Sequence, residues 1–205
     1  MKFAARRNAA LATLAALLIL VPAARADEVT DQLAAAREAY DAGDLRNAVN
    51  SLNFVIAKIR EQETARLLTL LPAPLAGWQA DPAQSETPGI ASMITGTNLT
   101  RRYFRPEGGE VKLTVTADSP LLPMLTMFLA SPFMMQADPG SKPYAFKGQQ
   151  GLIKHDPQSS DYEVTLMIGN RILIQGKGSG LPDGTAVQQY VESVDLSALQ
   201  KAFGG

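Results

Sequence analysis

The sequence predicts an α+β fold, in which an N-terminal helical hairpin precedes an antiparallel sheet covered by helices. Residues 30–70 contain no proline and a single glycine, and apolar residues recur there at helical spacing. Two later segments, 111–117 and 162–168, alternate apolar with polar residues, as strands with one buried face do. The resulting order of elements is two helices, strands, a helix, strands and a final helix. This order is typical of α+β proteins whose helices cover one face of the sheet.

Residues 1–26 predict a secretory signal peptide. A basic start is followed by an apolar run from Ala9 to Val21 and by Ala24-Arg25-Ala26, which fits a cleavage site. A membrane anchor is the alternative, but the apolar run is short for a span and ends at Pro22. We therefore expect cleavage after Ala26 and a mature protein that is free in a bacterial periplasm, or secreted, with no membrane span.

Removal of this segment changes the charge of the chain. The 205 residues carry a formal net charge of −1. Residues 1–26 hold four basic and no acidic residues, which leaves 15 basic and 20 acidic residues and a net charge of −5. This balance disfavours nucleic acid as a partner. With no cysteine and one histidine, the chain has no disulfide, no thiol nucleophile and no multi-histidine metal site, so we expect no cofactor.

Residues 27–71 predict the helical hairpin. Leu33, Ala36 and Tyr40 recur at helical spacing, and Gly43-Asp44 interrupts the pattern. A second helix begins near Leu45, and its apolar stripe consists of Ala48, Val49, Leu52, Val55, Ile56 and Ile59. The string AREAYDAGDLRNAVNSL resembles a single tetratricopeptide-type helical pair, without a second copy of the repeat. Two roles remain open: a hairpin packed on the following domain, or a hairpin that binds a partner.

Residues 72–205 predict the sheet domain. In its first half we expect strands from Ile90 to Phe104, a turn at 105–109, a strand at 111–117 and a helix within 119–136. In its second half we expect a strand from Tyr144 to His155, a strand at 162–168 that turns at Gly169-Asn170 and returns through Ile174, a helix from Thr185, and a short last helix ending at Phe203. Gly176-Lys177-Gly178-Ser179-Gly180 fits no phosphate-binding spacing, and we interpret it as a flexible strand exit.

Residues 70–203 also carry a resemblance. The strings VKLTVTADSPLL, YEVTLMIGNRILIQGKGSG and VESVDLSALQKAF, in this order, resemble uncharacterised exported proteins of Gram-negative bacteria. The order of elements is similar to the PsbP-like α/β/α sandwich. The resemblance rests on strands and helices and not on catalytic motifs, so it assigns no functional residue. It implies an accessory or binding protein rather than an enzyme.

The segment 119–136 is rich in methionine. It holds four of the six methionines of the mature chain and one phenylalanine that we include as a candidate: Met124, Met127, Met134, Met135 and Phe133. Met124 and Met127 are three residues apart, so a helix would place them on one face. Three interpretations remain open: a buried helix, an exposed apolar groove for a lipid-like ligand or partner peptide, and a Cu(I) site built from thioethers.

A second candidate cluster consists of Arg101 and Arg102, with Arg105 nearby and the aromatic residues Tyr103 and Phe104 between them. These residues form either a solvated strand face or a surface that binds an acidic partner. His155 lies at a predicted strand end, where we expect it to face solvent. No motif marks a nucleophile, a general base or a metal ligand, so no catalytic residue is assigned.

Taken together, the sequence predicts a non-enzymatic accessory or interaction protein of the bacterial envelope that acts in the periplasm. Its expected partner is another envelope protein. The alternative is a protein that binds a small apolar ligand between the sheet and the methionine-rich helix, and a minor alternative is Cu(I) binding through methionines.

Overall fold

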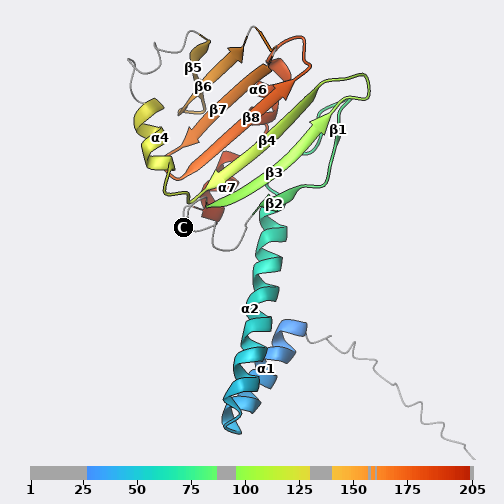
Figure 1. Cartoon of the computed structure of the whole chain (residues 1–205), viewed down its shortest axis with the longest axis vertical. Helices are drawn as coiled ribbons and strands as arrows, with labels where there is room; N and C mark the ends of the chain where they lie inside the picture. Colours follow the sequence, from blue (N-terminus) through green and yellow to red (C-terminus); the bar gives the residue numbers. More distant parts are fainter. Residues whose placement is uncertain (1–26, 87–95, 130–139, 157, 160, 204–205) are drawn as a thin grey trace, which may run out of the picture. The chain divides into compact units, whose positions relative to one another are not determined.

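The computed structural model describes residues 27–86, 96–129, 140–156, 158–159 and 161–203, and the chain divides into two units, residues 1–56 and 57–205 (Figure 1). A helical pair precedes an eight-stranded antiparallel sheet with its own helices, which confirms the predicted α+β fold. The division falls after Ile56, inside the second helix, whereas the sequence divides the chain after Leu71. The predicted signal peptide, residues 1–26, lies outside the described residues.

The helical pair consists of α1 (Glu28–Asp41) and the first part of α2 (Leu45–Leu68), as the sequence predicts. Gly43 has a φ of 77°, a left-handed conformation that glycine adopts readily and that allows the chain to reverse between the helices. The Asp44 carboxylate accepts a hydrogen bond from the backbone N–H of Asn47 at 3.2 Å, which caps the start of α2. The buried side chains of this pair are Ala36, Ala48 and Val55.

The sheet has the strand order β1-β3-β4-β8-β7-β6-β5, with β2 paired to β3, and every neighbouring pair is antiparallel. The strands are β1 (Gln79–Ala80), β2 (Gln84–Glu86), β3 (Thr97–Phe104), β4 (Glu110–Ala117), β5 (Ser141–Phe146), β6 (Gln149–Asp156), β7 (Asp161–Ile168) and β8 (Ile172–Ser179). The pairing of β4 with β8, in which Ala117 faces Ile172, joins the β3–β4 hairpin to the strands β5 to β8.

One predicted strand is wrong. The sequence predicts a single strand from Tyr144 to His155, but this segment contains the end of β5, a two-residue turn and most of β6. The turn consists of Lys147 and Gly148, with φ values of 48° and 77°. Two consecutive positive φ values are typical of the tight turns that suit the twist of a β-hairpin. The sequence does not indicate this turn, because a residue other than glycine, such as Lys147, is uncommon in that conformation.

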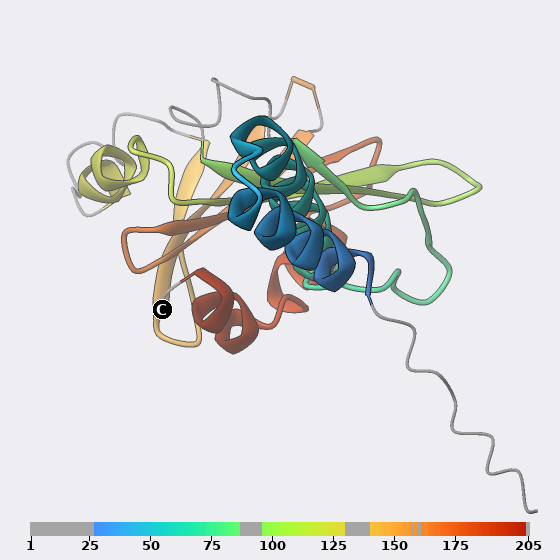
Figure 2. The same ribbon diagram turned by 90° about the horizontal axis from the view of Figure 1, so that it is seen from below.

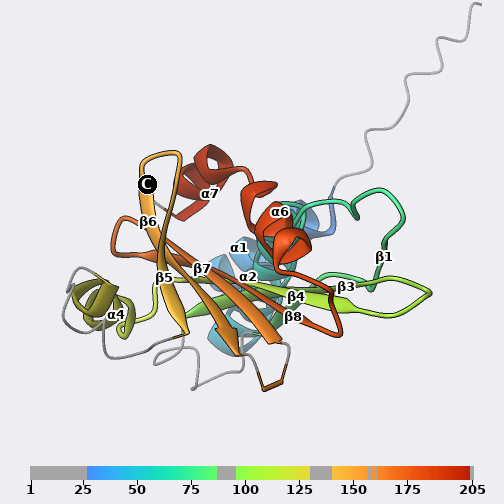
Figure 3. The ribbon, with the colours of Figure 1, turned by 90° about the horizontal axis from the view of Figure 1, so that it is seen from above.

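Helices α6 (Thr185–Glu192) and α7 (Leu196–Phe203) lie on one side of the sheet (Figure 3). The main core forms between them and the inward-facing strand residues; its largest fully buried members are Tyr103, Tyr190, Leu99, Leu113, Leu166, Ile174 and Leu199. The glycines of β8 lie under α6. A Cβ atom at Gly176 would stand 2.9 Å from methyl groups of Val187 and Val191. Gly176 to Ser179 are therefore part of a packed strand, and their interpretation as a flexible strand exit is wrong.

Helix α4 (Leu122–Leu129) lies away from α6 and α7, at one end of the sheet (Figure 2). Leu122 and Leu125 pack against Leu152, Met167 and Leu173. Met167 and Leu173 alternate along their strands with core residues such as Leu166 and Ile174, so α4 covers part of the opposite face. The α+β pattern of elements predicts helices on one face of the sheet, and the structure adds this second, smaller layer.

Candidate functional site

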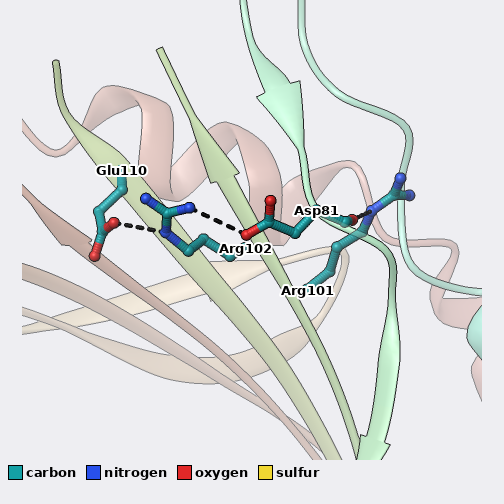
Figure 4. A network of polar contacts seen from close by, with 4 residues as sticks. All are labelled: Asp81, Arg101, Arg102 and Glu110. Atoms are coloured by element: carbon teal, nitrogen blue, oxygen red, sulfur yellow. Dashed lines mark hydrogen bonds and ion pairs between the residues drawn. The ribbon is translucent and has the colours of Figure 1, made fainter. Parts of the chain in front are cut away.

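Arg101 and Tyr103, two of the predicted site residues, hold the segment that follows α2. The Nε atom of Arg101 donates a hydrogen bond to the backbone carbonyl of Asp81 at 3.0 Å (Figure 4). Its Nη1 atom donates a hydrogen bond to the backbone carbonyl of Pro72 at 3.2 Å. The hydroxyl of Tyr103 donates a hydrogen bond to the same Pro72 carbonyl at 2.8 Å. The side chains therefore fix residues 72–81 against β3.

Tyr103 lies in the main core. Its ring stacks on Tyr190 with centroids 4.0 Å apart, and Trp78 meets Tyr190 edge-on at 5.4 Å. Burial raises the pKa of Tyr103 and the pKa of Tyr190 above the ordinary tyrosine value. Both rings are fully buried, so the structure accounts for Tyr103 as a packing residue.

Arg102 points to the other face of β3. Its guanidinium forms ion pairs with Glu110 at 2.7 Å and with Asp81 at 3.0 Å, and these hydrogen bonds raise its pKa (Figure 4). It also lies over the ring of Phe104, 4.9 Å from the centroid. Its three neighbours belong to the same chain. That Arg101 and Arg102 grip an acidic partner stays a prediction.

Charged side chains form a row across the face of the sheet that bears Arg102. In direct register, Arg102 faces Lys112, Lys112 faces Lys177, Lys177 faces Glu163, and Glu163 faces Lys154. Lys177 reaches Glu163 at 3.9 Å. Lys112 therefore stands between two cations, an arrangement that costs stability in a sheet. The sequence marks Lys112 as an outward residue but cannot align it with Lys177, because the register between β4 and β8 is set by the fold.

The methionine-rich segment is described only in part. Met124 is 69% exposed and Met127 is 76% exposed, and both point away from the sheet, since Leu122 and Leu125 make the contacts to it. For these two side chains, the interpretation as a buried helix is wrong. The other three candidates of this segment, Phe133, Met134 and Met135, lie outside the described residues.

In the part of the chain that the structure describes, most of the exposed large apolar side chains lie on the helical hairpin. Among the described residues eleven large apolar side chains are exposed, and eight of them lie between positions 33 and 59. The sequence groups Ala48 and Val55 with Val49, Leu52 and Ile56 in one stripe. The structure separates them: Ala48 and Val55 are buried, whereas the other three are exposed.

The exposed residues of the first unit form two rows. On α1 the row is Leu33 and Tyr40, seven residues apart; on α2 it is Leu45, Val49, Leu52 and Ile56, spaced by four, three and four residues. Such spacing keeps a row on one side of a helix, as in coiled coils. Successive residues of an α-helix are about 100° apart around the helix axis. Counted from the buried residues Ala36 on α1 and Ala48 on α2, this angle places both rows on the same side of the antiparallel pair. We call these six residues the hairpin face.

Phe54 is an exposed apolar residue of α2 that does not belong to the hairpin face. It is 37% exposed, close to the 43% of Leu52, but it stands two positions away and therefore on another side of the helix. The 4-3-4 spacing from Leu45 to Ile56 is visible in the sequence and could have identified the hairpin face. What the sequence does not show is that α1 covers only the neighbouring row of Ala48 and Val55.

The remaining chemistry of the described residues is modest. His155, which the sequence places at a solvent-facing turn, lies on β6 and stacks half-buried on Tyr162 with ring centroids 4.3 Å apart. In the described part of the chain, no three His, Asp or Glu side chains cluster as a metal ion would require. Within the same residues, no helix has the length and apolar character needed to cross a membrane.

Comparison of the chain with protein-family models, with curated proteins and with solved structures found no match. The resemblance to exported proteins and to the PsbP-like sandwich therefore stays a prediction. The hairpin face is the candidate functional site, and its assignment rests on the exposure and spacing of its own residues.

Proposed function

We propose that this chain is a non-enzymatic accessory protein of the bacterial periplasm, which binds another envelope protein through the hairpin face. The observation that carries the proposal is the gathering of six exposed apolar side chains on one side of α1 and α2. Contiguous apolar surface of this kind commonly marks a protein interaction site. The predicted signal peptide supports the compartment.

The hairpin face is favoured over α4 as the binding element. Helix α4 has eight residues, and Leu122 and Leu125 are already packed against the sheet. Its exposed apolar side chains among the described residues are Met124 and Met127, together with Leu121 just before it. The apolar-ligand and Cu(I) alternatives depend on this element, whereas the hairpin offers twice as many side chains over two longer helices.

The geometry also indicates the kind of partner. Rows of apolar residues at a spacing of three and four are complementary to the side of another helix, where ridges and grooves interdigitate. An envelope protein that presents one or two amphipathic helices fits the hairpin face. The helix-in-groove mode of recognition uses anchors with this same spacing.

Native mass spectrometry of the tagged mature protein, taken from the periplasm of its own source, tests the proposal. We expect a protein complex with wild type and loss of that complex with Leu52→Glu, because a carboxylate at the centre of an apolar interface lacks a partner. Phe54→Glu is the matched control, since it changes the same helix on another side, and it should retain the complex.

Two outcomes would contradict this function. Equal recovery of the complex with Leu52→Glu and with wild type would exclude the hairpin face as the binding site. A small-molecule adduct in place of a protein complex, lost with Met124→Ser but not with Leu52→Glu, would instead establish the apolar-ligand alternative at α4.

A further inference from the structure

The helical pair has too little core of its own. Three side chains are buried between α1 and the first part of α2, and two of them are alanines. Short helices are marginal in water, and most of their stability comes from packing an apolar face against another element. Five of the six residues of the hairpin face are larger than any of the three that are buried. Most of the large apolar side chains of this pair are therefore not used in the packing of α1 against α2.

We infer that a second copy of this chain packs its hairpin face on the first, so that α1 and α2 of the two copies form a four-helix bundle. This inference shares the hairpin face with the proposed function, and it goes beyond that function by naming a second copy of the chain, in place of another envelope protein, as the occupant. In a two-fold dimer each copy uses the same patch, so one face covers the other completely. The 4-3-4 spacing on α2 suits the side-by-side packing of such bundles.

The available area is sufficient for a dimer. A buried aliphatic side chain removes roughly 100 Å² of apolar surface from water, and an aromatic one about 200 Å². At the observed exposures the six side chains offer on the order of 400 Å² per copy, or about 800 Å² for two copies. Since somewhat more than half of an interface is apolar, the total approaches roughly 1,200–1,400 Å². Specific interfaces begin at about 1,200 Å².

Charge argues against a lipid surface as the occupant. Residues 27–56 contain six acidic and two basic side chains, a net charge of −4. Helices that lie on anionic membranes carry lysine and arginine beside their apolar face. The same charge predicts how salt acts on the dimer. Two copies with net −4 repel each other, so added salt should leave the dimer unchanged or strengthen it, whereas binding of a basic partner would weaken.

Sedimentation velocity of the purified mature chain over a range of concentrations, in low and in high salt, tests the inference. We expect a monomer–dimer equilibrium that is not weakened by salt. Leu52→Glu and Val49→Glu should each raise the dissociation constant by about 30-fold or more, as loss of a central interface residue does. Phe54→Glu should not change it. Circular dichroism and thermal unfolding of each variant establish that the sheet domain still folds.

A chain that stays monomeric at high micromolar concentration overturns the inference, and so does a dimer that all three variants retain. Binding of wild type to vesicles of anionic lipid in place of dimerisation would identify a membrane as the occupant and equally overturn it. The proposed function is separable from these results. A monomer whose complex with an envelope protein still depends on Leu52 leaves that function standing, whereas a dimer without such a complex contradicts it and supports the inference.

Discussion

Arg101 and Arg102 are adjacent in the sequence but stabilise different parts of the molecule. Arg101 donates hydrogen bonds to two part-buried carbonyls, whereas Arg102 pairs with two carboxylates that are themselves about half exposed. Removal of a donor from buried acceptors is costly, and removal of a solvent-screened ion pair is not.

We expect Arg101→Ala to lower the free energy of unfolding by about 1–3 kcal/mol. Arg102→Ala should have a clearly smaller effect, because water and salt screen its ion pairs. Urea unfolding of the two variants measures the difference. Equal losses would mean that the Pro72 and Asp81 carbonyls do not depend on Arg101. Because Arg101→Glu would also perturb folding, Arg102→Glu alone is the cleaner test of an acidic partner.

Tyr103 and Tyr190 predict a loss of stability in alkali. Burial raises the pKa of each above 10.0, the ordinary value of the unfolded chain. Above about pH 10 the unfolded state therefore releases protons that the folded state retains, and stability falls as the pH rises. Thermal unfolding between about pH 8 and 11 checks this sign. Tyr103→Phe should reduce the slope at high pH, and an unchanged slope would contradict the assignment to Tyr103.

At the scale of elements, the glycines of strand β8 allow helix α6 to pack closely on the strand. At Gly178 an added Cβ atom would clash with a methyl group of Val187 and would stand 2.7 Å from Leu181 Cδ1. We expect Gly178→Ala to destabilise the fold by about 1–3 kcal/mol, through overpacking. Lys177→Ala, one position away on the opposite face, should change stability by no more than about 0.5 kcal/mol. Equal effects in denaturant unfolding would contradict the close approach of α6.

The charged row on the sheet predicts a stabilising substitution. Lys112 faces Arg102 on one side and Lys177 on the other, so Lys112→Glu replaces two unfavourable pairs with favourable ones. We expect Tm to rise by about 1–3 °C at low ionic strength. High salt should remove most of the gain, because all these side chains are exposed. A gain that is independent of salt would point to a cause other than charge.

The elements were largely predictable where a local pattern defines them, and less so where distant strands meet. Alternation predicted β4 and β7, helical spacing predicted α1 and α2, and Gly169-Asn170 marked a turn. The sequence pattern does not predict the Lys147-Gly148 turn, because lysine rarely adopts a left-handed conformation. The packing role of Gly176 was missed because it depends on α6, which follows later in the chain.

At the scale of the whole molecule, the main core contains none of the described residues of the first unit, 27–56. Its members begin at Leu67 and Leu71 and continue to Phe203. We therefore expect a chain shortened to residues 57–205 to unfold cooperatively with a Tm close to that of the mature protein. Thermal unfolding followed by circular dichroism compares the two. A collapse of cooperativity in the shortened chain would show that the hairpin stabilises the sheet domain.

The candidate site could be predicted in part. The amphipathic hairpin and its possible role in binding follow from the sequence. The hairpin face does not, because Val49 and Val55 are equally apolar and only the position of α1 decides which of them is covered. The arginine cluster is a different case: the fold gives Arg101 and Arg102 partners within the chain, and their role in binding an acidic partner stays a prediction.

Strand β5 affects whether the protein aggregates at high protein concentration. It ends the strand order, and Pro143 interrupts its outer row of backbone donors, with Lys142 beside it. A proline and a charge on an outermost strand discourage another chain from adding a strand there. At the opposite end, β1 and β2 are two and three residues long, too short to template a neighbour. The sheet thus resists edge-to-edge aggregation, and association is left to the helices.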